Sequence, residues 1–155
     1  MRSRAIFLLI IGAGASAPVQ AQDAQVQLWE AAISGDTTAL RGALTAGAKV
    51  DSLDTRRSAN GRRALNWAAL NNQVPAIRLL LAAGAKIDTA NRTGFTALHH
   101  AAEAGSLEAA TELLKAGANP KLTNLAGVTP AQVARERGFA SVAALLEAAE
   151  QGKRP

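Results

Sequence analysis

A repeat of nearly constant length runs through the chain and constrains its fold more than any other sequence feature. Gly-Ala pairs begin at Gly47, Gly84 and Gly117, so successive pairs are 37 and 33 residues apart. Repeats of this length are typical of solenoids, in which each unit buries its apolar face only by stacking on its neighbours. We therefore expect a stack of similar units and not a fold built on the pairing of distant strands.

Each repeat unit has the sequence pattern of two helices separated by a tight turn. The second helices are marked by apolar residues at i, i+3 and i+4, which share one helix face; two such sets are Ile77, Leu80, Leu81 and Ala110, Leu113, Leu114. Short alanine-rich stretches mark the first helices, at 28–33, 65–70, 98–104 and 131–137. The residues that break the chain between the two helices are Gly35, Asn72, Gly105 and Gly138. The 37 alanines of the chain also favour helices over sheets, because alanine has the highest helix propensity.

At these positions the sequence resembles the ankyrin repeat. The family's Thr-Pro-Leu-His-x-Ala-Ala signature is matched by Thr96-Ala97-Leu98-His99-His100-Ala101-Ala102, and in weaker form by residues 63–69 and 129–135. The resemblance covers roughly residues 26–150 and implies an all-α ankyrin-repeat solenoid of about four helix–turn–helix units with short hairpin-like loops. The expected units lie at about 26–57, 58–93, 94–126 and 127–150.

The first and last units depart from the repeat pattern. The first begins directly in its helix, with Trp29 in place of the signature histidine. The last has Glu147 at the position of Leu114 and Glu150 at the position of Gly117. Because no further unit covers the end of a solenoid, its terminal units need a polar outer face. We interpret both departures as built-in caps of a four-unit domain.

The N-terminus has the pattern of a cleaved export signal. Arg2 and Arg4 precede an apolar stretch at 5–15, and Val19 and Ala21 fill the −3 and −1 positions of a signal-peptidase site. We expect cleavage after Ala21 and a periplasmic or secreted mature chain. The alternatives are an N-terminal anchor and a frayed helix, although the apolar stretch is shorter than the roughly twenty residues that span a membrane.

Cleavage would divide the chain into a signal peptide at 1–21, a repeat domain at 22–150 and a loose tail at 151–155. The loss of two arginines would lower the formal net charge from +5 to +3. This small charge and an exported location argue against nucleic-acid binding, which needs a strong basic surface. We expect a monomer with no stable membrane insertion after cleavage.

Residues that enzymes use are sparse in this sequence. The chain has no cysteine and two histidines, His99 and His100. As neighbours on a helix these histidines point about 100° apart, so they do not form the i, i+4 pair of a zinc site. The glycines are spaced as helix ends and form no phosphate-binding loop. We therefore expect no catalysis and no bound metal or cofactor.

The ankyrin resemblance gives structural roles to several of the polar and aromatic residues. It implies that His99 bonds the backbone around its turn and that Asn91 forms a turn in its loop, and we place His100 at the surface. We expect Trp29 and Trp67 to pack in the core or between repeats, because a tryptophan buries a large area.

The loop between the first and second units is four residues longer than its counterpart. Gly61 lies ten positions after Asp51, whereas Gly94 lies six positions after Asp88. This region carries the one charge run of the chain, formed by Arg56, Arg57, Arg62 and Arg63. Charge and insertions are common in solvated loops, and arginine is also enriched at protein interfaces. A solvated loop and a partner-contacting loop both remain open.

The resemblance also implies a partner-binding face on the concave side of the solenoid, formed by loop tips and the exposed sides of the first helices. Besides the four arginines, its residues would be Leu70, Asn71, Arg92, Thr93, Phe95, Glu103, Leu125, Val128, Glu136 and Arg137. We expect the four apolar members to be exposed, as at protein-binding surfaces. The sequence thus predicts a non-catalytic module that binds a protein partner, acidic in character, and masks or stabilises it.

Two other classes of function are compatible with the sequence. An enzyme or small-ligand receptor would use the concave groove, and it would be favoured by a cluster of Glu103, His100 and Arg137 with strongly shifted pKa values. A purely structural spacer would retain no partner at all.

Overall fold

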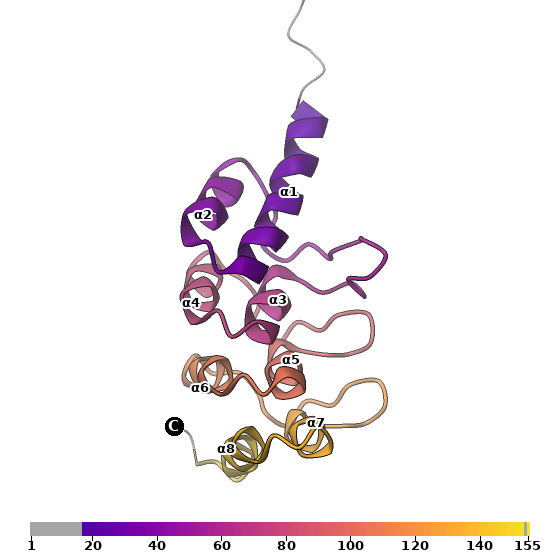
Figure 1. Cartoon of the computed structure of the whole chain (residues 1–155), viewed down its shortest axis with the longest axis vertical. Helices are drawn as coiled ribbons and strands as arrows, with labels where there is room; N and C mark the ends of the chain where they lie inside the picture. The colour runs from indigo at the N-terminus through magenta and orange to yellow at the C-terminus, as the bar shows by residue number, and fades with distance from the viewer. Residues whose placement is uncertain (1–16, 154) are drawn as a thin grey trace, which may run out of the picture.

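The computed structural model describes residues 17–153 and 155, with side chains at 22–153 and 155. This part of the chain forms eight α-helices and no strand. The odd-numbered and even-numbered helices make two rows that stack along the long axis of the molecule (Figure 1). Four helix pairs therefore stack as units, which confirms the predicted all-α solenoid. The helices are α1 (Ala17–Ser34), α2 (Thr37–Thr45), α3 (Ala64–Leu70), α4 (Val74–Ala82), α5 (Ala97–Ala104), α6 (Leu107–Lys115), α7 (Pro130–Glu136) and α8 (Ala140–Glu150).

The tight turns lie where the sequence predicts them. All four helix-breaking residues have a positive φ, of 80° at Gly35, 55° at Asn72, 71° at Gly105 and 81° at Gly138. This left-handed conformation ends a helix and favours glycine, and asparagine is among the few other residues that tolerate it. At Gly105 a Cβ atom would also lie 2.5 Å from the Phe139 ring. Glycine is therefore required there both by its backbone conformation and by the space available.

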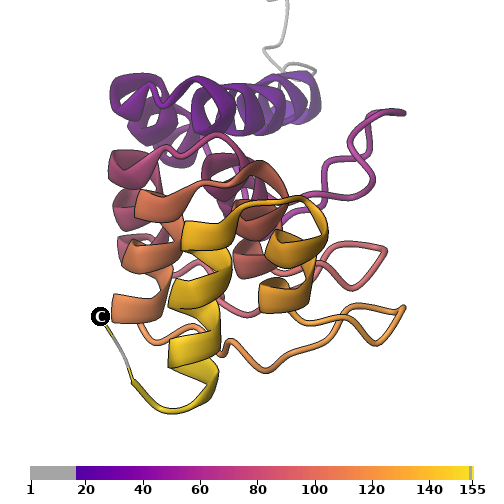
Figure 2. The same ribbon diagram turned by 60° about the horizontal axis from the view of Figure 1, so that its bottom comes forward.

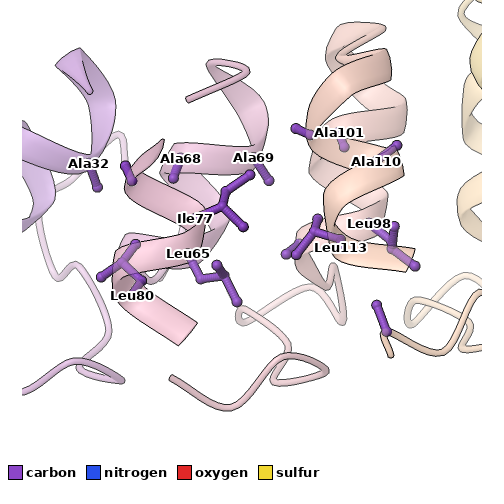
Figure 3. Packing of buried hydrophobic residues seen from close by; sticks show 14 of the residues in the cluster. Ala32, Leu65, Ala68, Ala69, Ile77, Leu80, Leu98, Ala101, Ala110 and Leu113 are labelled. Atoms are coloured by element: carbon purple, nitrogen blue, oxygen red, sulfur yellow. The ribbon is translucent and has the colours of Figure 1, made fainter. Parts of the chain in front are cut away.

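The core lies between the two helix rows and is built mainly from alanine and leucine. Ala68, Ala69 and Ala101 are fully buried, and Leu80 and Leu113 of the second helices pack against the same core (Figure 3). Because alanine adds little bulk, helices of neighbouring units approach closely and cover one another's apolar faces. Because the helices lie this close together, the core is filled without many large aromatic side chains.

Hydrogen bonds between successive loops also join the units. The Asp51 carboxylate accepts from the backbone N–H of Lys86 at 3.2 Å, and the next unit repeats this bond. In the first unit the Gln25 side chain takes the same role, accepting from the Lys49 N–H at 2.8 Å and donating to the Lys49 carbonyl at 3.2 Å. Helix α1 therefore supplies the first unit with the contact that a preceding loop supplies to the later ones.

Helix α1 is longer than the sequence pattern predicts. The alanine-rich pattern marks this helix from residue 28, yet it begins at Ala17. Its additional turns carry Gln25 and the buried Ala24, so they continue the packing of the first unit. The arginines and apolar stretch of the predicted signal peptide lie outside the described residues. No helix among the described residues has both the length and the apolar character needed to cross a membrane.

The last unit ends differently from the others, as its sequence indicates. Glu147, at the position that leucine fills in the other units, forms an ion pair with Arg135 of α7. Glu150 stands in the glycine position and is the last residue of α8, and the left-handed residue that follows the helix is Gly152, with a φ of 86°. Backbone hydrogen bonds from Gly152 and Lys153 to the last turn of α8 fix the start of the segment that the sequence predicts to be loose.

Candidate functional site

Three hairpin loops project from the same side of the stack, beside the row of first helices (Figures 1 and 2). Each is closed by a hydrogen bond from a backbone N–H to a carbonyl, and the closing pairs are Asp54–Arg62 (2.8 Å), Asn91–Phe95 (2.9 Å) and Asn124–Val128 (3.0 Å). The first pair is eight residues apart and the others are four apart, so the predicted four-residue insertion is confirmed and lies inside the first hairpin. We call the surface formed by these loops and the adjoining sides of α3, α5 and α7 the hairpin face.

Asparagine side chains form the second and third hairpins. The Asn91 amide oxygen accepts from the backbone N–H groups of Thr93 and Phe95, both at 2.9 Å. Asn124 makes the equivalent bonds to Ala126 and Val128, at 2.9 and 3.1 Å. The turn-forming role that the ankyrin resemblance implies for Asn91 is thereby confirmed.

The first hairpin has a buried carboxylate, Asp54, in the position of these asparagines. Asp54 is 0% exposed and binds the Arg56 guanidinium, whose Nε donates to the two carboxylate oxygens at 2.9 and 3.0 Å. Trp67 Nε1 donates to the same carboxylate at 3.0 Å. Burial by itself would raise the pKa of Asp54, but the hydrogen bonds from Arg56 and Trp67 outweigh it and hold that pKa below its ordinary value. Asp54 is therefore ionised and paired.

Two arginines of the arginine-rich loop are bound within the protein. Besides Asp54, Arg56 contacts Glu30 at 3.3 Å and lies 5.6 Å from the centre of the Trp29 ring, while Arg63 donates to the Asp51 carbonyl. Within the described part of the chain, Arg57 makes no ion pair or side-chain hydrogen bond. Arg56 and Arg63 therefore hold the loop against the first unit, so a simply solvated loop is wrong for these two residues, and their contact with a partner stays a prediction.

His99 has the structural role that the resemblance implies. It is 0% exposed, and its Nδ1 accepts from the Thr96 backbone N–H at 3.2 Å. This leaves a proton on Nε2, which lies 3.0 Å from the Val128 carbonyl in the next hairpin. Burial lowers the pKa of His99, so the neutral ring joins two neighbouring units.

His100 is buried, contrary to the surface position predicted for it. It is 1% exposed, because the second hairpin folds over the ring and Phe95 packs on it at a centroid distance of 5.4 Å. Nδ1 lies 3.1 Å from a Glu103 oxygen and Nε2 lies 3.3 Å from the Asn91 amide nitrogen. These partners fix a neutral ring that donates from Nδ1 and accepts at Nε2. Burial lowers the pKa of His100, although the nearby Glu103 partly opposes this.

The Glu103 carboxylate on α5 lies close to three basic side chains. Besides His100 it meets Arg137 at 3.4 Å and Arg62 at 3.9 Å. The hydrogen bond from His100 lowers the pKa of Glu103, and the charges of Arg62 and Arg137 lower it further. The structure thus brings together Glu103, His100 and Arg137, the three residues that would favour a small-ligand function.

A small pocket opens on the hairpin face beside this cluster. It has a volume of about 230 Å³, and its lining residues are Asn60, Arg62, Asn91, Thr93, Phe95, His100 and Glu103. We call it the Glu103 pocket. Both nitrogens of His100 are occupied and its ring is buried, so this histidine is not placed to exchange a proton with a ligand. No three His, Cys, Asp or Glu side chains among the described residues come together as a metal site.

The remaining residues of the predicted partner face differ in exposure. Those exposed are Asn71, Arg92, Thr93, Leu125, Glu136 and Arg137, and Leu125 is the most prominent, at 80%. Leu70, Phe95 and Val128 are half-buried, so the expectation of exposure is wrong for three of the four apolar residues. For Phe95 the reason is its packing on the rings of both histidines.

Two residues of the hairpin face were missed from the sequence. Asn60 has a φ of 52° and donates through its side-chain amide to the Thr93 hydroxyl at 3.3 Å, which joins the first two hairpins. The second is Asp54, whose carboxylate binds Arg56 of the arginine-rich loop. Asp54 could have been recognised because, aligned on the closing glycines and allowing for the insertion, it occupies the position of Asn91 and Asn124.

Comparison with known protein families agrees with the stacked helix pairs of the structure. A family model described as ankyrin repeats (3 copies) matches residues 28–124, which is more than half of the chain. The match extends from within α1 to the third hairpin, and the pair α7 and α8 lies beyond it. No curated protein matches the chain.

Proposed function

Because the chain belongs to the ankyrin-repeat family, whose repeats are protein-interaction modules and generally non-catalytic, we propose that it is an exported protein that binds a partner protein through its hairpin face. It acts by masking or stabilising that partner. The observation that carries this proposal is the set of exposed side chains on the hairpin tips, with Leu125 80% exposed. An exposed leucine beside exposed arginines has the mixed apolar and guanidinium character of protein interfaces.

A small-ligand function for the Glu103 pocket is the weaker alternative. The meeting of Glu103, His100 and Arg137 favours it. However, the pocket volume of about 230 Å³ is below the roughly 300–1,000 Å³ of ordinary ligand sites. A cavity of this size is better matched to one side chain of a partner than to a separate ligand.

Export rests on the sequence pattern of the N-terminus. The core residues Ala24 and Leu28 follow the proposed cut, so removal of the residues up to Ala21 would leave the described core intact. We expect N-terminal sequencing of the mature protein to begin at Gln22 and the protein to be found in the periplasmic or secreted fraction. An intact Met1 on protein from the cytosolic fraction would contradict the export proposal.

The role of the hairpin tips can be tested by replacing Leu125. The partner is first identified by cross-linking in the periplasm and mass spectrometry, and its affinity is then measured with purified proteins. We expect Leu125→Ser to weaken binding about tenfold, since burying a leucine contributes about 1.5–3 kcal/mol. The melting temperature should not change, because Leu125 is 80% exposed in the free protein.

The matched control is Leu107→Ser. Leu107 is also an exposed leucine, at 36%, but it begins α6 in the helix row away from the hairpins (Figure 1). We expect this variant to bind the partner as tightly as the unmodified protein. Equal affinity of the Leu125 variant would remove the hairpin tips from the interface, and the recovery of no partner at all would favour a structural spacer.

A further inference from the structure

The Arg62 guanidinium on the wall of the Glu103 pocket lacks the hydrogen bonds that such a group ordinarily makes. Its side chain is only 17% exposed, and it lies over the Trp67 ring at 4.8 Å from the ring centre. Its Nε is buried and has no hydrogen-bond partner. The nearest carboxylate, Glu103, is 3.9 Å away, which is too far for a hydrogen bond. Buried donors without partners are rare and costly, so this one requires an explanation.

Glu103 makes no hydrogen bond to Arg62, because its nearest oxygen lies 3.9 Å from the Arg62 guanidinium and its hydrogen bonds go to two other groups. It accepts from His100 at 3.1 Å and from Arg137 at 3.4 Å. With His100 neutral, the single Glu103 carboxylate is shared by two guanidinium groups, that of Arg62 in the pocket lining and that of Arg137 outside it. One further carboxylate would balance the charge and supply acceptors for Arg62.

The shape of the pocket suits a single carboxylate group. Phe95 forms an apolar wall, and Thr93 and Asn60 form a polar wall in which the Thr93 hydroxyl donates to Asn91 at 2.9 Å. Stacking on Trp67 holds the Arg62 fork in place, so little conformational entropy is lost when it binds. Guanidinium groups bind carboxylates through two parallel hydrogen bonds.

We propose that the Glu103 pocket receives a glutamate or aspartate side chain from an acidic segment of the partner protein, and that Arg62 is its anchor. This inference rests on the proposed function and names the partner chemistry at one place on the hairpin face. Arg57 and Arg92 are exposed on the neighbouring loops and extend the basic surface along which an acidic segment would lie.

The test uses nuclear magnetic resonance of the mature protein with three probes: end-blocked hexaglutamate, end-blocked hexaglutamine and free glutarate. We expect hexaglutamate alone to cause a saturable shift of the Arg62 Nε–H signal, because the guanidinium that carries this proton gains a carboxylate partner. Arg62→Gln should weaken hexaglutamate binding at least about tenfold, since a charge-assisted hydrogen bond contributes about 1.5–3 kcal/mol. The conservative variant Arg62→Lys keeps the charge without the fork and should bind with intermediate affinity.

The matched control is Arg57→Gln, which removes an exposed arginine of the same loop and should weaken binding about twofold or less. Melting temperatures establish that each variant is folded. If Arg62→Gln does not fold, the proposal is tested by the Arg62 Nε–H shift in the unmodified protein and by the affinity of the Arg62→Lys variant. Equal binding of hexaglutamine, or undiminished hexaglutamate binding by a folded Arg62→Gln variant, would overturn the proposal. Glutarate binding as tight as that of hexaglutamate would assign the pocket to a free small acid and would also overturn it.

These outcomes are separate from those that concern the proposed function. If the partner identified in the periplasm binds the Arg62→Gln variant as tightly as the unmodified protein, the carboxylate pocket is refuted and partner binding stands. If hexaglutamate binds through Arg62 but no partner protein is recovered, the pocket stands and the proposed function fails.

Discussion

Replacing Leu114 or Leu98 with alanine should lower the free energy of unfolding by about 2–5 kcal/mol, the range found when a buried leucine is truncated. Leu114 is 0% exposed and Leu98 is 1% exposed. The neighbouring core positions are largely alanines, whose side chains have no rotamers with which to fill the cavity that truncation leaves. Urea denaturation of the mature protein, followed by circular dichroism, measures this loss.

Glu147→Leu is the control for this prediction, because Glu147 occupies the position of Leu114 in the last unit. Its side chain is 37% exposed and is paired with Arg135, and no further helix of the described chain covers it. We expect a far smaller change in stability, or self-association through the newly apolar end. A loss at Glu147 as large as that at Leu114 would mean that another element packs on this surface.

The helix pairs could be predicted from the sequence because glycine and asparagine fix where each helix ends. The left-handed turns at Gly35, Asn72, Gly105 and Gly138 depend on local backbone conformation alone, so their positions are readable without knowledge of the contacts. The solenoid then follows because the apolar faces between these turns can be buried only by neighbouring units.

The exposure of single residues could not be predicted in the same way, because it depends on contacts between elements. His100 is buried by a hairpin whose path the helix pattern does not contain. Its spacing from Glu103, three residues on the same helix, is the one local signal that the two side chains meet. Likewise, the bonds of Gln25 in the extra turns of α1 to Lys49 link residues far apart in the sequence.

In the arginine-rich loop, too, the exposure of charged residues could not be predicted from the sequence pattern alone. A run of arginines indicates a surface, and Arg57 does lie there. The neighbouring Arg56 is instead bound to Asp54, whose side chain is inaccessible to solvent. The difference between the two arginines arises from one residue, an aspartate in the position where the other hairpins have asparagine.

Arg56→Ser should therefore lower the free energy of unfolding by about 3 kcal/mol, because it leaves a buried carboxylate without its counter-charge. The estimate lies at the lower end of the range for broken buried pairs, since the Arg56 side chain is 37% exposed and water can replace part of it. Arg57→Ser, one residue along the same loop, should change the stability by less than about 0.5 kcal/mol. Thermal and urea unfolding of the two variants measures the difference, and equal small effects would show that the Asp54–Arg56 pair contributes nothing to stability.

A second substitution separates the unpaired charge from the lost arginine contacts. In the other two hairpins an asparagine oxygen accepts from the backbone N–H two residues on, as Asp54 does from Arg56, so Asp54→Asn added to Arg56→Ser replaces the buried charge with a neutral group that keeps this bond. If the buried charge causes the loss, the double variant should regain most of the stability. If it is no more stable than Arg56→Ser alone, the loss comes instead from the contacts of Arg56 with Trp29 and Glu30, which both variants lack.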